Sequence, residues 1–152
     1  MSTALEQRLR DDLTTAMRAR DELTTATVRM TLTALQTEAV SGKQARELSD
    51  AEVLQVLTRE AKKRREAAEA YDTAGRPELA ARERAEGEVL ARYLPTPLTD
   101  EEIRALVACT IASLGASGMG AMGSVMKAVT AQTTGRADGG RVSAEVRKQL
   151  AS

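Results

Sequence analysis

The chain has 152 residues, with Lys plus Arg and Asp plus Glu balanced at 22 each, and it contains no Phe, Trp or His. This length suits one domain of ordinary size or two small ones, and the balanced charge points to no polyanionic partner along the chain as a whole. The main apolar residues are Ala, Leu, Val and Met. Because strands favour aromatic and β-branched side chains, this composition disfavours a sheet protein. We therefore expect an all-α fold.

Cysteine content and hydropathy exclude several further classes of protein. Cys109 is the single cysteine, so neither an internal disulfide nor a cysteine-based zinc site can form. The N-terminus carries charges where a signal peptide needs an apolar run, and no stretch approaches about 18 uninterrupted apolar residues. We expect a cytoplasmic protein that does not enter the membrane, with Cys109 as a small core residue of a helix.

Apolar residues at helical spacing predict two helices before residue 42. The first covers roughly 3–21, and the second ends near Gly42. Six threonines between positions 24 and 37 weaken the second helix, each by some tenths of a kcal/mol relative to Ala, which packing would have to offset. The expected inner faces of the two helices consist of Leu5, Leu9, Leu13, Met17, Val28, Leu32, Leu35 and Ala39.

A long helical hairpin is predicted over 49–94. Ser49-Asp-Ala-Glu52 is a capping box that opens a helix to about residue 74, and Gly75-Arg-Pro77 ends it and starts the next. With the turn centred there, positions whose numbers sum to about 151 face each other. Glu86 then faces Arg65 or its neighbour Arg64, and we predict an ion pair that is at least partly buried.

The stretch Leu94-Pro-Thr-Pro-Leu98 marks a boundary, because two prolines so close together cannot continue a helix. We expect an N-terminal helical domain over 1–95 and a small C-terminal domain over 96–152. The second domain is predicted as a three-helix bundle with helices at 99–114, 119–134 and 139–151. Asp138 is expected to cap the last helix.

The segment Gly118-Met-Gly-Ala-Met-Gly123 fits the pattern G-x-G-x-x-G of dinucleotide-binding proteins. That site requires a strand before the glycines and a helix whose N-terminus meets the pyrophosphate. Here an amphipathic helix precedes the segment, so we expect no dinucleotide site and no cofactor. Gly115 and Gly118 more plausibly end one helix and turn the chain, while Gly120 and Gly123 would permit close helix approach.

The same region carries a family resemblance. Met122-Gly-Ser-Val-Met126, Gly135-Arg-Ala-Asp138 and the spacing of the last helix resemble the tail motif of the GatB/YqeY family. Free-standing YqeY-like members are also similar in earlier stretches. These are Ala16-Met17, Val28-Arg-Met30-Thr-Leu32, Lys62-Lys-Arg64, Gly75-Arg76, Leu79, Glu86 and Tyr93-Leu-Pro95.

This resemblance implies an all-α protein with an N-terminal helical domain and a small C-terminal bundle. It also links the chain to the tail of the GatB subunit of a glutamine-dependent tRNA amidotransferase, a carbon–nitrogen ligase, where that tail helps to hold tRNA. The catalytic portion of GatB has no counterpart in 152 residues. The resemblance therefore implies tRNA or a tRNA-charging enzyme as a partner without implying catalysis.

The residues themselves give little sign of catalysis. The absence of His removes the commonest general base and metal ligand, and no G-x-x-x-x-G-K-[ST] phosphate loop is present. Ser117 and Ser124 near Lys127 are a poor substitute for a Ser-Ser-Lys amidase site. We expect no autonomous catalysis and no metal site, although an enzyme subunit active only in a complex is a third hypothesis.

Two binding hypotheses remain. In the first, the tail binds tRNA phosphates through its basic residues, which only Asp138 and Glu145 oppose. In the second, the chain docks a protein partner through its N-terminal helices or the hairpin. Basic residues gathered on one tail face would favour the first, and an exposed apolar stripe on 3–21 the second. The run Lys62-Lys-Arg-Arg65 could meet phosphates or be a solvated helix face. The candidate phosphate contacts are Lys127, Arg136, Arg141, Arg147 and Lys148, and the motif residues are Gly123, Gly135, Asp138, Arg64, Arg65 and Glu86.

Overall fold

The computed structural model describes residues 3–152, and no strand occurs among them, so the all-α prediction is confirmed. The chain forms two compact units, one that extends to Leu94 and one over Pro95–Ser152. Among the described residues no single helix is long and apolar enough to cross a membrane. One helix pair bent by 96°, Asp100–Leu114 with Met119–Thr133, meets the criteria of length and composition when taken together.

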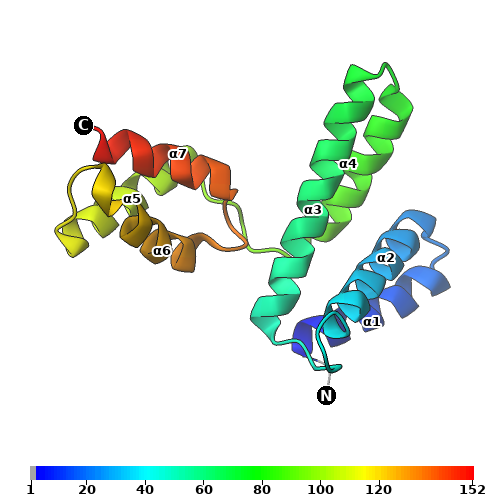
Figure 1. The fold of residues 1–152 in the computed structure, drawn as a ribbon. Coiled ribbons are helices and arrows are strands. Elements are labelled where there is room, and N and C mark those ends of the chain that lie inside the picture. The colour runs from blue at the N-terminus through cyan, green and yellow to red at the C-terminus, as the bar shows by residue number, and fades with distance from the viewer. Residues whose placement is uncertain (1–2) are drawn as a thin grey trace. The chain divides into compact units, whose positions relative to one another are not determined.

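The first unit contains two pairs of helices (Figure 1). They are α1 (Ala4–Arg18), α2 (Glu22–Ala39), α3 (Asp50–Thr73) and α4 (Pro77–Ala91). Helices α3 and α4 form the predicted hairpin, and their far ends extend beyond α1 and α2. The shared core of this unit consists of Leu9, Val28, Leu35, Leu48, Val53, Val56, Leu57, Val89, Leu90 and Tyr93.

Side-chain caps set where the helices of this unit begin. Thr3 accepts a hydrogen bond from the Glu6 amide at 3.2 Å, and Ser49 with Glu52 forms the predicted capping box. Asp21 accepts from the Thr24 amide at 3.1 Å and opens α2. The first helix is therefore shorter than the expected 3–21, because Asp21 already belongs to the next helix as its cap.

Three of the threonines that weaken α2 are buried in the structure. Thr24, Thr27 and Thr31 are at most 5% exposed. The hydroxyls of Thr27 and Thr31 each donate to the carbonyl four residues earlier at 2.8 Å, and the Thr24 hydroxyl donates to Asp21. Burial costs little here because each hydroxyl is satisfied within its own helix.

Tyr93 fastens the end of the hairpin to α1. Its ring is 5% exposed, its hydroxyl donates to Asp12 at 2.5 Å, and the Arg8 guanidinium lies 4.7 Å from the ring centre. Burial, together with the adjacent Asp12 carboxylate, raises the pKa of the Tyr93 phenol well above its usual range. The phenol is therefore held as a donor where the chain leaves the first unit.

The second unit consists of α5 (Asp100–Leu114), the 3-10 turn η1 (Met119–Ala121), α6 (Met122–Thr133) and α7 (Gly139–Leu150). A capping box of Thr99 and Glu102 opens α5, as predicted. Its separate core consists of Leu98, Ile103, Val107, Val125, Val129, Val142, Val146 and Leu150.

Two glycines of this unit turn the chain between helices. Gly115 has φ +61 and ends α5, and Gly118 has φ +74 in the turn before η1. A helix precedes the glycines where a dinucleotide-binding site needs a strand. The expectation of close helix approach at Gly120 and Gly123 is wrong, because a Cβ at either position would meet open space.

Two further expectations are corrected. Cys109 is exposed, because it lies off the stripe of Ile103, Val107 and Thr110 that α5 buries. Met17 is 50% exposed, because it lies in the last turn of α1, where its sulfur contacts only the outer guanidinium of Arg29 among the contacts described. Cys109 is exposed because of the face of α5 on which it lies, and Met17 because of its place near the end of α1.

Candidate functional site

The loop between α6 and α7 holds the segment that leads into α5. Gly135 has φ +81, a left-handed conformation that glycine adopts without strain, and the chain turns there. The Leu98 amide donates to the Arg136 carbonyl at 2.7 Å, and Arg136 Nε donates to the Thr96 carbonyl at 3.1 Å. Through these two bonds of Arg136, the Gly135-Arg-Ala-Asp138 stretch holds residues 96–98 against the loop.

Arg141 extends this fastening to the first turn of α5. Its Nη2 lies 2.5 Å from Asp100 Oδ1 and 3.4 Å from the Leu98 carbonyl. The hydrogen bond from Arg141, with its charge, lowers the pKa of the Asp100 carboxyl below its usual range. The Asp100 side chain is 84% exposed, so water screens much of this attraction.

Asp138 opens α7. Its Oδ1 accepts a hydrogen bond from the Gly140 amide at 3.2 Å, and its backbone is extended, as at a helix N-cap. The predicted role of Asp138 as a cap is confirmed. It fixes the direction in which α7 leaves the loop, and hence where the basic side chains of that helix stand.

The five candidate phosphate contacts divide into two groups. Arg136 and Arg141 are engaged within the unit, as described above. Lys127, Arg147 and Lys148 are exposed, and within residues 3–152 none of the three makes an ion pair. We call these three side chains the free basic set. Lys127 lies on α6 away from buried Val125 and Val129, while Arg147 and Lys148 lie in the last turn of α7.

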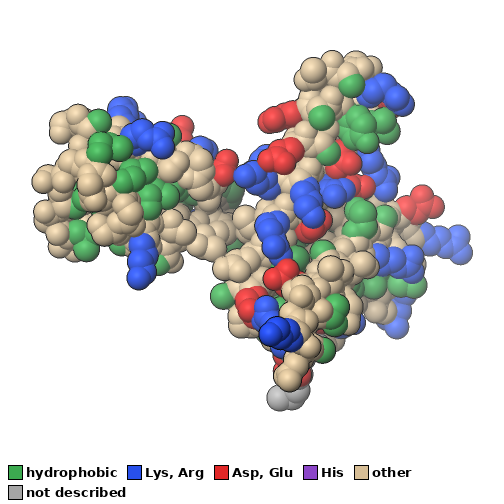
Figure 2. All heavy atoms as spheres, in the orientation of Figure 1, with side chains coloured by type: hydrophobic (Ala, Val, Ile, Leu, Met, Phe, Trp, Pro, Cys, Tyr) green, Lys and Arg blue, Asp and Glu red, His purple; other side chains and the backbone are tan. Residues whose placement is uncertain are grey.

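The basic side chains of this unit do not form a single cluster on the face that Figure 2 draws. Most of the Lys and Arg side chains in view lie toward one edge of the unit with Asp and Glu side chains among them, and another stands apart at the opposite edge. The drawn face therefore has no continuous basic groove.

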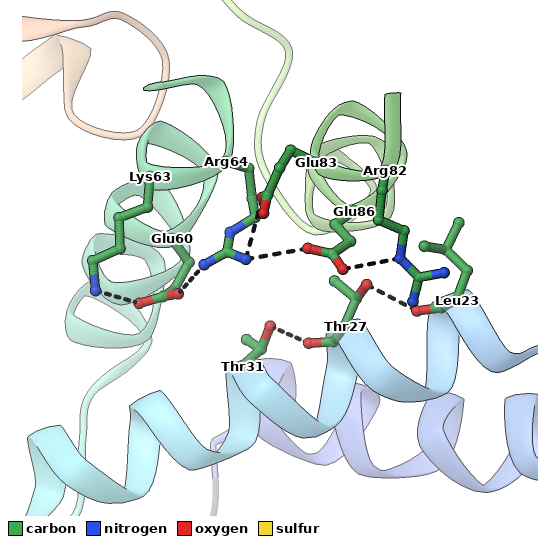
Figure 3. A network of polar contacts seen from close by, with 9 residues as sticks. All are labelled: Leu23, Thr27, Thr31, Glu60, Lys63, Arg64, Arg82, Glu83 and Glu86. Atoms are coloured by element: carbon green, nitrogen blue, oxygen red, sulfur yellow. Dashed lines mark hydrogen bonds and ion pairs between the residues drawn. The ribbon is translucent and has the colours of Figure 1, made fainter. Parts of the chain in front are cut away.

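A second polar cluster lies in the hairpin of the first unit, around Arg64 (Figure 3). Arg64 Nη1 lies 3.1 Å from Glu86 Oε2 and 3.3 Å from Glu83 Oε2, and Arg64 Nη2 lies 3.9 Å from Glu60. Arg82 Nε reaches the other oxygen of Glu86 at 3.2 Å. The expected ion pair with Glu86 is made by Arg64.

In this cluster the Glu86 side chain is more deeply buried than the Arg64 side chain that it contacts. Glu86 is 7% exposed, and the Arg64 side chain is 20% exposed. Glu83 Oε2 is shielded from solvent and accepts no hydrogen bond within the described chain, although the Arg64 guanidinium is close. Arg65, the alternative partner, is exposed and lies outside the cluster.

Arg64 lies opposite Gly87 of α4. A Cβ at Gly87 would lie 3.7 Å from the Arg64 Cβ, an ordinary contact distance. Positions 64 and 87 sum to 151, as the hairpin geometry requires. Each carboxylate of the cluster lies beside a cation, which suits a role in holding the two helices in register.

The rest of the basic run in α3 behaves as a solvated helix face. Lys62 and Lys63 are exposed and pair with Glu66 at 3.9 Å and Glu60 at 3.1 Å. Such exposed pairs contribute little to stability. Within residues 3–152, no group of three or more His, Cys, Asp and Glu side chains is placed to hold a metal ion.

An apolar groove of about 270 Å³ lies between α5 and α6. Its walls include the exposed side chain of Cys109 and the half-exposed side chain of Leu114. The full lining consists of Leu106, Cys109, Thr110, Ser113, Leu114, Ala128 and Gln132.

Comparison with known protein families matches residues 6–150 to the YqeY-like proteins. The chain belongs to the YqeY-like family. The match includes both compact units, the hairpin cluster around Arg64 and the loop that carries Gly135 and Asp138. A search of curated proteins finds no match.

Proposed function

We propose that this YqeY-like protein is a cytoplasmic accessory factor that binds tRNA, or assists a tRNA-charging enzyme such as an amidotransferase, without catalysis of its own. Its RNA contacts lie on α6 and α7. The resemblance of the M-G-x-V-M and G-x-A-D stretches to the GatB tail supports a tRNA partner.

The observation that carries the proposal is the excess of positive charge from Met122 to the C-terminus. This part of the chain has five basic residues against Asp138 and Glu145, in a protein whose total charge is balanced. The free basic set is available for phosphates because none of its three side chains makes an ion pair within residues 3–152. Phosphate attracts Lys and Arg whatever the base sequence.

The contacts are few, so the affinity should be modest and strongly dependent on salt. Each neutralised phosphate releases counterions, and three contacts give a slope of log binding constant against log salt of roughly −2 to −3. Arg136 and Arg141 contribute less than the free basic set, because their guanidinium groups already bond to Thr96, Leu98 and Asp100.

The test is a variant that removes the free basic set, with Lys127→Gln, Arg147→Gln and Lys148→Gln. Gln keeps helix propensity close to that of Lys and Arg. A matched control carries Arg18→Gln, Lys43→Gln and Arg65→Gln, three exposed residues of the first unit. Fluorescence titration of total tRNA should show weakened binding in the first variant alone.

A thermal melt of both variants accompanies the titration. Arg147 and Lys148 also favour α7 through the helix dipole, by a few tenths of a kcal/mol each. Equal weakening in both variants would show that only total charge matters, and an absence of binding in the wild type would reject the proposal.

If the wild type does not bind RNA, the alternative function is docking of a protein partner through the N-terminal helices or the hairpin. The N-terminal surface first considered for docking is mostly covered, because Leu9 is buried and Leu5 and Leu13 pack against the core. The exposed apolar stripe that would have favoured docking through α1 is therefore largely absent, and the net positive charge from Met122 onward remains the support for RNA.

A further inference from the structure

Both aromatic residues of this chain lie in the first unit. Tyr71 and Tyr93 are the two aromatic residues of the sequence, and neither lies in residues 95–152. Tyr93 is buried under Arg8 and bonded to Asp12, and Tyr71 is partly buried in α3. The unit that carries the free basic set thus has no aromatic ring to offer a base.

Single-stranded RNA is bound chiefly by stacking its bases on aromatic rings or arginine planes, each stack being worth about 1–3 kcal/mol. In the second unit, the Arg136 and Arg141 guanidinium groups bond to the chain around Thr96–Asp100. Two of the four arginine planes of this unit are therefore already occupied by protein partners. Arg104 and Arg147 are the guanidinium planes that remain, and no aromatic ring of this unit could sandwich a base against them.

The arrangement of the cations gives a second, independent argument. A flexible strand is usually followed by a continuous basic groove along its backbone. On the drawn face of this unit, Asp and Glu side chains lie among the cations, and one cation stands apart from the others (Figure 2). The free basic set stands on α6 and α7, whose other faces pack into the core through Val125, Val129 and Val146.

Rigid, separated cations suit phosphates whose own positions are already fixed. A double helix holds its phosphates in a regular array, so binding it needs little ordering of the RNA. A flexible strand would lose conformational freedom for the same few contacts. The free basic set therefore matches a duplex better than an open strand.

We infer that the free basic set binds the phosphate backbone of double-helical RNA without reading its bases. This inference rests on the proposed RNA-binding function and names the part of the RNA that is bound. A paired stem is sufficient for binding, and unpaired bases add little to the affinity.

The test uses the full chain and three RNA probes of equal nucleotide count. They are a fully paired stem, a stem of scrambled sequence and an unstructured oligouridine. Both stems should bind alike, and about tenfold or more tighter than oligouridine, a difference of about 1.4 kcal/mol. The Lys127→Gln, Arg147→Gln, Lys148→Gln variant should lose this preference, while the Arg18→Gln, Lys43→Gln, Arg65→Gln control should keep it.

The outcomes separate this inference from the function on which it rests. If oligouridine binds as tightly as the stems, or the two stems differ severalfold, backbone recognition of a duplex is overturned while RNA binding stands. If none of the three probes nor total tRNA binds, both are rejected. If the control variant loses binding as fully as the tail variant, binding depends on total charge, and the assignment of the contacts to the free basic set is overturned.

Discussion

At the scale of single residues, Arg64 faces several carboxylates within the hairpin. Glu60, Glu83 and Glu86 all lie within 4 Å of its guanidinium. A buried ion pair adds little to stability beyond a good apolar packing, but removing one partner is costly because the other charge stays buried.

Glu86→Ala should lower stability by about 2 kcal/mol, between the small effect of an exposed pair and the 3–5 kcal/mol of a deeply buried one. The loss is intermediate because Glu83 and Glu60 still face Arg64. Chemical denaturation measures it. Glu88→Ala, on the exposed side of the same helix, should leave the midpoint unchanged. Equal stability of the Glu86 variant and the wild type would show that the pair does not hold the hairpin.

The Asp100–Arg141 pair predicts a pH effect. Arg141 lowers the folded-state pKa of Asp100, so its contribution to stability is present above the unfolded pKa of about 3.9 and is lost as pH falls through the folded value. In Arg141→Ala, the pKa of Asp100 should rise toward that ordinary value, as an NMR titration of the side-chain carboxyl would show. An unchanged titration would mean that the pair is not formed in solution.

At the scale of helices and loops, local signals predicted the fold well. The capping boxes at Ser49 and Thr99 and the glycine at 115 are short-range features that act within a few residues of the chain. The sequence also predicted that Glu86 forms an ion pair with an arginine, but it did not decide whether that arginine is Arg64 or Arg65. In the structure Arg64 lies opposite Gly87 and beside Glu86, a contact between helices that periodicity alone does not describe.

The candidate site was harder to predict for the same reason. Arg136 and Arg141 appear in the sequence as free positive charges near glycines. Their partners at Thr96, Leu98 and Asp100 lie about 40 residues away along the chain. Only the folded unit brings that segment to the loop. The sequence predicted that the proline-rich segment 94–98 is a domain boundary, but not that it bonds to the loop between α6 and α7.

Two glycines of the family motif should respond to Ala in opposite ways. Gly123 lies within α6 and faces open space, so Gly123→Ala should raise stability by roughly 0.5 kcal/mol. Gly135 has φ +81, so Gly135→Ala should lower stability by about 1 kcal/mol or more. Thermal melts of the two variants measure both shifts. A loss of stability at Gly123 would indicate that this position is packed more closely than it is here.

At the scale of the whole molecule, each compact unit has its own buried core. A domain with its own core can fold alone, although a small one is only marginally stable. The fragment Pro95–Ser152 should therefore show helical circular dichroism and a cooperative melt at low temperature. A fragment without a cooperative transition would show that the C-terminal unit depends on the rest of the chain.

The central claim is that the free basic set of α6 and α7 binds RNA phosphates. The most direct test is the salt dependence of tRNA binding for the wild type and for the Lys127→Gln, Arg147→Gln, Lys148→Gln variant. We expect a wild-type slope of roughly −2 to −3 that becomes nearly flat in the variant, which remains folded. Equal slopes for the two proteins, or no binding by the wild type at low salt, would contradict it.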